Sequence, residues 1–426
     1  MTEAHLTDQN DRRILVIGGG MAGMTAAIEA AEARCRVTLI EKTPYLGGRV
    51  ARTNLYFPKL CPPACGLEIN FKRIKNNPDI VVWTMAELES LSGSPGDYEA
   101  SVRISPRFVT DACTMCGSCA EACPVEIPDD FNLGLSKTKA AHLPHSMAFP
   151  ARYVIERSAC PPGCRACKDA CTYGAIDLDQ PVEHRKLRPG AVIAATGWQP
   201  YDAARIENLG FGRYPNVITN VIMERLAAPN GPTGGKILRP SDGKAPQSVA
   251  FAQCAGSRDE NHLPYCSTVC CAASLKQATY LRTQYPEAGV TIFYIDVRTP
   301  GRLEDFYVKV TADDKIKLIK GKAAKVEEDA GTRDILVTAE DVLSGKRTTQ
   351  RVQLLVLATG IVPQTEGLPA GFELDEHRFV RSIAGKTGLY AAGCAQRPEE
   401  VSASVQDGTG AALKALQCLV KGARHE

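Results

Sequence analysis

A short apolar segment that runs straight into three glycines constrains this chain more than any other feature. Residues 13–17 (RILVI) are followed by GGGMAG at 18–23, which fits the pattern G-x-G-x-x-G. This order predicts a buried parallel strand, a tight turn and a helix from Met24 to Ala33, with a second strand at 37–40. The chain therefore opens with a β–α–β unit of the kind that binds dinucleotides.

The residues of this motif each contribute to the binding of a dinucleotide phosphate. Gly18 permits the tight turn, Gly20 lets the backbone approach a pyrophosphate, and Gly23 lets helix and strand pack closely. Met21 and Ala22 lead into the helix, whose N-terminal N–H groups and positive dipole end attract phosphates.

The residues after the second strand favour FAD over NAD. Glu41, with Lys42 beside it, ends that strand, where a carboxylate accepts hydrogen bonds from ribose hydroxyls. Gly47-Gly48-Arg49 then resembles the second glycine motif of flavoproteins that bind two dinucleotides.

Later segments fit the same reading. The strand endings Thr196-Gly197 and Thr359-Gly360 resemble the paired hinge motifs of those flavoproteins, and residues 388–393 (GLYAAG) resemble their terminal flavin-binding segment. That segment normally ends in Gly-Asp, with the Asp holding the ribityl chain. Here Cys394 follows Gly393, so we expect the ribityl contacts to be made differently.

The chain contains 17 cysteines, twelve of them in three groups at 113–123, 160–171 and 254–271. In a reducing compartment structural disulfides are disfavoured, so grouped thiols indicate metal or redox chemistry. The first two groups have ferredoxin spacing, in which the fourth cysteine of each run ligates the neighbouring cluster. We expect two 4Fe–4S clusters, one held by Cys113, Cys116, Cys119 and Cys171, the other by Cys160, Cys164, Cys167 and Cys123.

Zinc bound by four cysteines is the alternative at these sites. The second run also departs from the ferredoxin pattern. Three residues instead of two separate its first two cysteines, and its last cysteine is followed by Thr172, whereas the first run has Pro124 at that position.

The third group consists of four thiols within 18 residues, enough for another 4Fe–4S cluster: Cys254, Cys266, Cys270 and Cys271. They follow the end of a predicted strand at 249–252, the edge at which ligands of α/β sheets gather. The alternative is two buried thiols and a redox-active pair.

Other residues receive weaker interpretations. Cys61 and Cys65 could form a redox-active dithiol beside the flavin, but their spacing differs from C-x-x-C and favours structural or unassigned thiols. We assign no role to His142 and His145.

A nicotinamide site in the second α/β domain is not expected. In thioredoxin-reductase-like proteins the second α/β domain binds NAD(P)H through its own glycine motif. Here the strand at 249–252 runs into QCAGS at 253–257, which lacks the spacing needed to hold a pyrophosphate.

The whole pattern predicts an α/β, two-dinucleotide-binding, thioredoxin-reductase-like fold with an inserted ferredoxin-like domain. The expected order is the first part of the FAD-binding domain at 12–102, the ferredoxin insertion at 103–182, the middle FAD-domain strand at 183–200, a linker at 201–247, a degenerate NAD-domain-like region with the third cysteine group at 248–350, and the C-terminal part of the FAD domain at 351–426.

Charge and hydropathy exclude several functions. The net charge is +2, which offers no basic footprint for nucleic acid or an anionic membrane surface. No stretch approaches 18 consecutive apolar residues, and the N-terminal segment lacks the apolar core of a signal peptide. We expect a cytoplasmic protein, held at a membrane only through other subunits.

Taken together, these motifs resemble the heterodisulfide reductase A (HdrA) family, in particular the branch found in quinone-interacting membrane-bound oxidoreductase complexes of sulfate reducers. The stretches that carry the likeness include NGPTGGKILRPSDGK and CAGSRDENHLPYCSTVCCAASLKQATY. The resemblance implies that the third cysteine group ligates a cluster. It also implies three partners: a related flavin and iron–sulfur subunit, a haem-bearing membrane subunit, and adenylylsulfate reductase supplied from the menaquinone pool.

We interpret the chain as an oxidoreductase subunit that relays electrons through FAD and its clusters, with no catalytic acid–base pair. A heterodisulfide reductase A-like flavin subunit of another electron-transfer complex, including one that bifurcates or confurcates electrons, is an alternative. A self-contained NAD(P)H-dependent flavin reductase and a redox sensor or scaffold with purely structural clusters are the rival readings.

Overall fold

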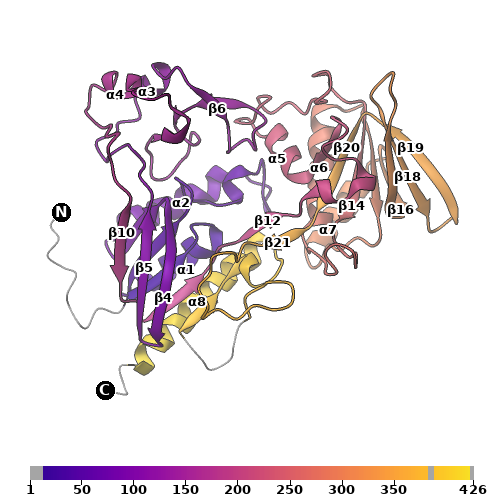
Figure 1. Ribbon diagram of the computed structural model, residues 1–426. Helices are drawn as coiled ribbons and strands as arrows, with labels where there is room; N and C mark the ends of the chain where they lie inside the picture. Colours follow the sequence, from indigo (N-terminus) through magenta and orange to yellow (C-terminus); the bar gives the residue numbers. More distant parts are fainter. Residues whose placement is uncertain (1–12, 382–387, 423–426) are drawn as a thin grey trace.

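The computed structural model describes residues 13–381 and 388–422, which form two α/β halves joined by two short strands, with an insertion beside the first half (Figure 1). Residues 1–12, on which the expectation of no signal peptide rests, lie outside the described residues.

The first half is built on a parallel sheet with helices packed on one face. Ile14 and Val16 of its central strand face these helices, whereas Leu15 faces the opposite side, as expected for a strand buried on both faces. The sheet order is β22 (Leu389–Ala391), β11 (Ala191–Ala194), β1 (Arg13–Ile17), β2 (Arg36–Glu41) and β3 (Ile80–Thr84), and the helices are α1 (Met21–Glu32), α2 (Pro63–Asn76) and α8 (Val401–Gly422).

A small antiparallel sheet covers the other face of the first half. Its core residues, such as Val102 and Leu187, pack against Leu15 and Val192 of the parallel sheet. The strands are β10 (Glu183–Leu187), β5 (Asp97–Ile104) and β4 (Ala86–Ser94).

The second half repeats this three-layer plan. Helices cover one face of a parallel sheet and an antiparallel sheet covers the other. The parallel order is β13 (Val217–Thr219), β20 (Leu354–Thr359), β14 (Ser248–Ala255), β15 (Gly289–Tyr294) and β16 (Ile316–Lys320); the helices are α5 (Asn220–Ala227), α6 (Cys270–Gln284) and α7 (Leu303–Thr311); the antiparallel strands are β17 (Ala323–Glu328), β18 (Ile335–Asp341) and β19 (Lys346–Val352).

Three sequence expectations differ from the structure. The helix after the glycines begins at Met21, not Met24, because Gly20 already stands at its N-cap. The segment 201–247 is not a simple linker, since β13 pairs with β20 and α5 packs in the helix layer. β20 itself lies between β13 and β14 in the second sheet, because its six residues are buried on both faces; residues 351–359 therefore belong to the second half.

Two short strands connect the halves. β12 (Trp198–Pro200) and β21 (Ile361–Pro363) pair antiparallel, directly after the two Thr-Gly segments that we interpreted as hinge motifs.

The cysteine-rich insertion between β5 and β10 contains little regular structure. Its elements are α3 (Ser118–Glu121), α4 (Ala166–Asp169), β6 (Glu126–Pro128), β7 (Lys137–Lys139), β8 (Ala141–His142) and β9 (Val154–Ile155). A bridge between Val109 and Ile176 brings the start and end of the cysteine region together.

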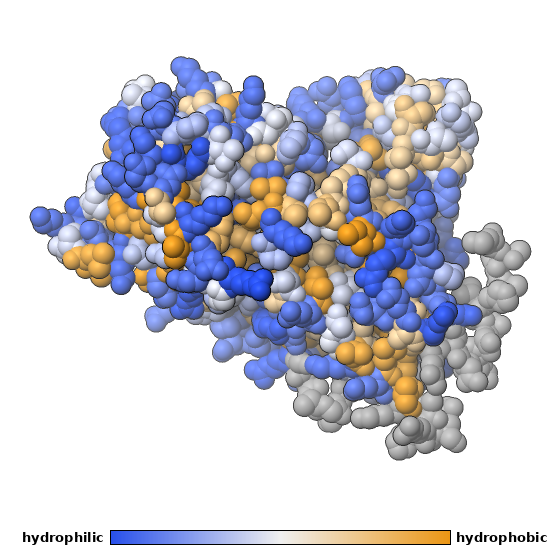
Figure 2. All heavy atoms as spheres, turned by 180° about the vertical axis from the view of Figure 1, so that it is seen from behind, coloured by the Kyte–Doolittle hydropathy of each residue, from blue (hydrophilic) through white to orange (hydrophobic). Residues whose placement is uncertain are grey.

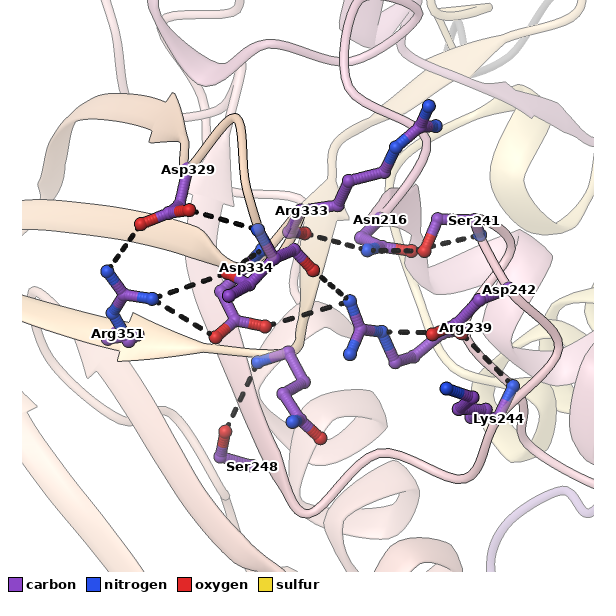
Figure 3. Close-up of polar contacts among 12 residues, drawn as sticks. Asn216, Arg239, Ser241, Asp242, Lys244, Ser248, Asp329, Arg333, Asp334 and Arg351 are labelled. Atoms are coloured by element: carbon purple, nitrogen blue, oxygen red, sulfur yellow. Dashed lines mark hydrogen bonds and ion pairs between the residues drawn. The ribbon is translucent and has the colours of Figure 1, made fainter.

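A polar network holds the loop after α5 in addition to the apolar packing of Ile237, which is buried in the core on the helix side (Figure 3). The buried Arg239 donates to the carbonyl of Thr332 at 2.9 Å and lies 3.6 Å from the carboxylates of both Asp242 and Asp334. Asn216 donates to the carbonyl of Arg333 at 2.8 Å. The loop is thereby attached to the turn between β17 and β18.

No helix in residues 13–381 and 388–422 combines the length and apolar character that a bilayer crossing requires. On the face shown in Figure 2, apolar side chains form separate patches between hydrophilic ones.

Candidate functional site

The glycine turn of the first half has the geometry of a pyrophosphate site. Gly18 has φ +106°, and a Cβ on Gly23 would overlap the carbonyl oxygen of Gly18. Gly20 is open by comparison, because a Cβ there would meet only Cα of Gly48 at 4.0 Å. The free N-terminus of α1, starting with Met21, points its N–H groups into this opening.

Glu41 holds the turn and the second glycine motif in place. It is buried, and its Oε2 accepts a 2.7 Å hydrogen bond from the backbone N–H of Gly19 while Oε1 accepts one of 2.8 Å from Thr43. The N–H of Gly47 donates to the carbonyl of Gly19 at 2.8 Å. Each carboxylate oxygen keeps a lone pair for a ribose hydroxyl, whereas Lys42 is exposed.

Arg49 connects the second glycine motif to the first hinge segment. Its Nε donates to the carbonyl of Trp198 at 3.1 Å and its guanidinium lies 5.1 Å from the indole centroid. Burial and then the neighbouring Arg52 lower the pKa of Arg49 to about 10. Thr196 lies against Gly18, so the pair Thr196-Gly197 borders the glycine turn.

The second hinge segment, Thr359-Gly360, lies in the second half and not beside the glycine turn. The expectation that it contacts the flavin is therefore corrected. Thr359 ends β20 in the second sheet, where its hydroxyl donates to Oδ1 of Asn220 at 2.9 Å. Its carbonyl accepts from the thiol of Cys270 at 3.7 Å. Thr359 and Gly360 therefore border the third cysteine group, because β20 runs beside β14.

Gly393 and Cys394 reach the dinucleotide turn from the C-terminal side. A Cβ on Gly393 would lie 2.9 Å from Cβ of Ala22, in the first turn of α1. Burial raises the pKa of Cys394 to about 11, and its thiol donates to the carbonyl of Glu399 at 3.4 Å. A protonated thiol that donates to this carbonyl cannot accept hydrogen bonds from the ribityl chain as the usual Asp carboxylate does.

The structure brings the first predicted cysteine set together. Cys113, Cys116 and Cys119 line one cavity with Cys171, which comes from the far end of the insertion. Burial, and then the nearby Cys113, raise the pKa of Cys119 to about 11. A cationic iron cluster would stabilise the thiolate that this apolar pocket disfavours.

The second predicted cysteine set also comes together, with Cys123 of the first run beside the cysteines of the second run. Burial raises the pKa of Cys167, and the neighbouring Cys123 and Cys160 raise it further. Cys164 and Cys123 act in the same direction on Cys160. Cys123 thus lies with the second run and Cys171 with the first.

The third set gathers around the end of β14. Cys254 has φ +57° at an irregularity in that strand, and Cys270 and Cys271 form the start of α6. Burial raises the pKa of Cys270, and Cys254, Cys271 and Cys266 raise it further, so all four thiols are neighbours.

Two cations stand beside this third set. Arg258 lowers the pKa of Cys254, which burial raises, and Arg298 does the same for Cys271.

In the described parts of the chain, no three His, Cys, Asp or Glu side chains converge closely enough to hold a single metal ion. The first four thiols instead line the wall of a cavity. That arrangement fits a polynuclear cluster better than a zinc ion with four sulfur ligands about 2.3 Å away.

The second half lacks the tight turn that a dinucleotide needs. Fourteen residues, 256–269, separate β14 from α6. They fold back on themselves, with the hydroxyls of Ser257 and Ser267 2.8 Å apart. The N-terminus of α6 carries cysteines rather than a glycine-rich turn, as the sequence predicts.

Sequence reasoning missed two buried groups near the first half. His145 stacks on Phe131 with centroids 4.5 Å apart and meets the edge of Tyr45 at 4.7 Å. Glu399 is buried beside Cys394. A lone histidine or glutamate in a loop gives no sequence pattern, so neither could be found without the fold. For Cys61 and Cys65, left unassigned, burial and then the neighbouring Cys65 raise the pKa of Cys61.

Comparison with known proteins shows what the chain is similar to. Residues 16–73 match the NAD(P)-binding Rossmann-like domain and residues 106–129 match the 4Fe-4S binding domain. The A subunit of the ferredoxin/F(420)H(2)-dependent CoB-CoM heterodisulfide reductase of Methanosarcina acetivorans is 38% identical over 426 residues, covering 96% of this chain and 54% of the relative. An iron–sulfur A subunit of the CoB–CoM heterodisulfide reductase of Methanopyrus kandleri is 38% identical over 96% of this chain and 65% of its own length.

The chain is similar to heterodisulfide reductase A subunits over 96% of its length. It spans between about half and two thirds of the length of the curated relatives it matches. The matched Rossmann-like and 4Fe-4S domains agree with the expected class, an FAD-binding iron–sulfur oxidoreductase subunit.

Solved structures confirm the fold. The thioredoxin reductase of Lactococcus lactis superposes with a TM-score of 0.54 at 15% identity, covering 96% of this chain and 99% of the other. That of T. acidophilum gives a TM-score of 0.53 at 15% identity, with coverages of 95% and 98%. The predicted thioredoxin-reductase-like α/β fold with a 4Fe–4S ferredoxin domain is therefore correct.

Proposed function

We propose that this chain is the flavin and iron–sulfur electron-transfer subunit of a heterodisulfide reductase A-like complex. The observation that carries the proposal is the crossed arrangement of the insertion, in which Cys171 joins the first cysteine run and Cys123 joins the second. Two 4Fe–4S clusters of ferredoxin type require this exchange. Independent zinc sites do not.

The residues of the chain would hold and tune the cofactors. Bound FAD would supply electron exchange in pairs or singly, and each cluster would carry one electron. The glycine turn and α1 would bind the pyrophosphate, and Glu41 a ribose. Arg258 and Arg298 would favour the reduced, more negative state of a third cluster on Cys254, Cys266, Cys270 and Cys271.

Composition analysis and anaerobic redox titration test this proposal. Native material should contain FAD, iron and sulfide, with more than one iron–sulfur signal by electron paramagnetic resonance. Zinc in place of iron, or protein without flavin, would overturn it. Neither NADH nor NADPH should bleach the flavin directly, whereas the rival NAD(P)H reductase requires rapid bleaching.

A more specific assignment is the A subunit of a quinone-interacting membrane-bound oxidoreductase, linking the menaquinone pool to adenylylsulfate reductase. The stretches around residues 230–244 and 254–280 support it, but the curated relatives support the broader assignment better, since their names refer to CoB–CoM heterodisulfide reductases. In the specific assignment, two partners, one a related flavoprotein and the other a haem-bearing membrane protein, hold the chain at the inner face of the cytoplasmic membrane.

Isolation of the native complex separates the two assignments. Mild detergent extraction should copurify a haem protein, and a menaquinol analogue should reduce the haem and then the iron–sulfur signals. A haem-free complex that takes electrons only from a low-potential donor such as reduced ferredoxin would support the alternative, in which the flavin bifurcates or confurcates electrons.

A further inference from the structure

A buried carboxylate beside the first turn of α1 lacks a hydrogen bond of ordinary geometry within the described chain. Glu399 is 7% exposed, and neither Oε1 nor Oε2 has a hydrogen-bond partner there. Nη2 of Arg397 carries two hydrogens; it donates to Asp407 at 2.8 Å and forms an ion pair with Oε2 of Glu399 at 3.0 Å, which leaves Oε1 and further lone pairs open for other donors. Because an unsatisfied buried carboxylate is costly, two acceptor oxygens in such a place indicate a missing donor.

The position of this carboxylate relates it to the dinucleotide turn. The hydroxyl of Ser404 in α8 lies within reach of the side chains of both Glu399 and Cys394 and lowers the pKa of each, which burial raises, so it supplies at most one donor to the carboxylate. One turn later, a Cβ on Gly408 would lie 2.5 Å from the carbonyl oxygen of Ala22. Glu399 thus lies beside Cys394 and Ser404, close to the place where Gly393 and α8 contact Ala22 in the first turn of α1.

The charges around Glu399 restrict the missing donor. The carboxylates of Glu399 and Asp407 share the guanidinium of Arg397, at 3.0 and 2.8 Å, so two acidic side chains face one cation and a phosphate is disfavoured there. An uncharged group with several hydroxyls is the remaining part of a flavin dinucleotide that can donate to both oxygens. On the opposite side of the turn, Glu41 already provides the acceptor for the ribose.

We propose that Glu399 accepts hydrogen bonds from the ribityl hydroxyls of FAD bound on the glycine turn. It supplies the carboxylate that is missing at Cys394. The inference rests on the proposed FAD binding, and it assigns Glu399 a positioning role that no sequence motif marks.

The test compares FAD affinity of the anaerobically purified full chain and its variants, after reversible removal of the flavin, by fluorescence quenching. Glu399→Ala should raise the dissociation constant of FAD about ten- to a hundredfold, the value of one or two hydrogen bonds to a charged group. Glu399→Gln should have a smaller effect, because its amide oxygen still accepts. Glu400→Gln is the matched control, since this partly exposed neighbour bonds to Ser402 and should bind FAD as the wild type does.

Iron content and the circular dichroism melting curve of the flavin-free proteins show whether each variant is folded. Wild-type affinity in folded Glu399→Ala and Glu399→Gln proteins would overturn the inference alone. A wild-type chain that binds no FAD would overturn the proposed function as well, so the two failures are distinguishable.

Discussion

The guanidinium of Arg225 is fully buried and donates two hydrogen bonds, of 3.0 and 2.9 Å, to Oδ1 of Asn132. Arg225 belongs to α5 in the second half, whereas Asn132 belongs to the cysteine-rich insertion. The same guanidinium lies 4.6 Å from the ring centroid of Phe131 and donates to the carbonyl of Arg52 at 3.1 Å. One side chain therefore joins both halves and the insertion.

Replacing Arg225 by Ala should destabilise the protein strongly. The substitution removes the donor to Oδ1 of Asn132 and to the backbone carbonyls of Arg52 and Asn230, which should lower the free energy of unfolding by about 2–4 kcal/mol. Urea unfolding followed by fluorescence measures the change. Arg213→Ala is the control, because Arg213 is exposed and its loss should cost less than about 0.5 kcal/mol. Equal stability of the two variants would contradict the role of Arg225 as the junction.

Gly23→Ala should abolish flavin binding and weaken the fold. A Cβ at this position overlaps the carbonyl oxygen of Gly18, so α1 must move away from the turn. Gly410→Ala is a matched control in α8, where no atom lies within 4 Å of the added Cβ. A helical Gly-to-Ala change should stabilise by about 0.5–1 kcal/mol and leave FAD content unchanged. FAD-to-protein ratios and thermal melting would show the contrast.

The crossed cysteine pairing predicts which cluster each substitution removes. Cys171→Ala should eliminate the same paramagnetic signal as Cys113→Ala, although the two residues belong to different runs, and iron should fall by about four atoms per chain. Cys123→Ala should eliminate the other signal. Cys65→Ser, outside all three sets, should leave iron unchanged. If Cys171→Ala instead removed the signal lost in Cys160→Ala, the pairing would be wrong.

His145 should make stability fall at mildly acidic pH. Burial, then Arg225 and Arg52, lower its pKa from 6.5 to about 4 in the folded state. Between these values the unfolded chain binds a proton that the folded chain does not. Stability is therefore full above pH 6.5 and decreases by up to about 1.4 kcal/mol per pH unit as the pH falls toward 4.

His145→Phe keeps the stacking on Phe131 and should remove this contribution, so the stability difference from wild type should shrink or reverse as the pH falls. The exposed His184 is the control. His184→Gln should retain the wild-type pH profile, and an identical profile for His145→Phe would refute the assignment.

Local patterns predicted the parts of the fold that depend on neighbouring residues in the sequence. The strand at 13–17, its glycine turn and the carboxylate of Glu41 follow from spacing alone. Local patterns could not predict that residues 201–247 contain a strand and a helix, or that β20 lies in the second sheet. Three buried residues, Val217–Thr219, form a strand only because β20 lies beside them, and β20 reaches that place from 137 residues further along the chain (354 − 217).

The site shows the same division. Cysteine spacing predicted the exchange between Cys123 and Cys171, since ferredoxin geometry repeats over short distances. Glu399 and His145 are defined by burial among residues distant in sequence, which no local pattern reports. Thr359-Gly360 does precede a strand that connects the two halves, β21, as a hinge motif would. Its contacts, however, are with the third cysteine group and not with the flavin turn, and sequence similarity alone could not reveal this.

The two paired strands between the halves would alone permit one half to rotate against the other. Contacts far from that connection oppose such rotation: Lys276 of α6 donates to the carbonyl of Leu55 at 2.6 Å, and Glu224 of α5 accepts from the N–H of Asn54 at 3.0 Å. The separation between the glycine turn and the cysteines of β14 is thus set when the chain folds. Any electron passing between them would tunnel across a constant gap, so its rate would respond to driving force and not to the viscosity of the solvent.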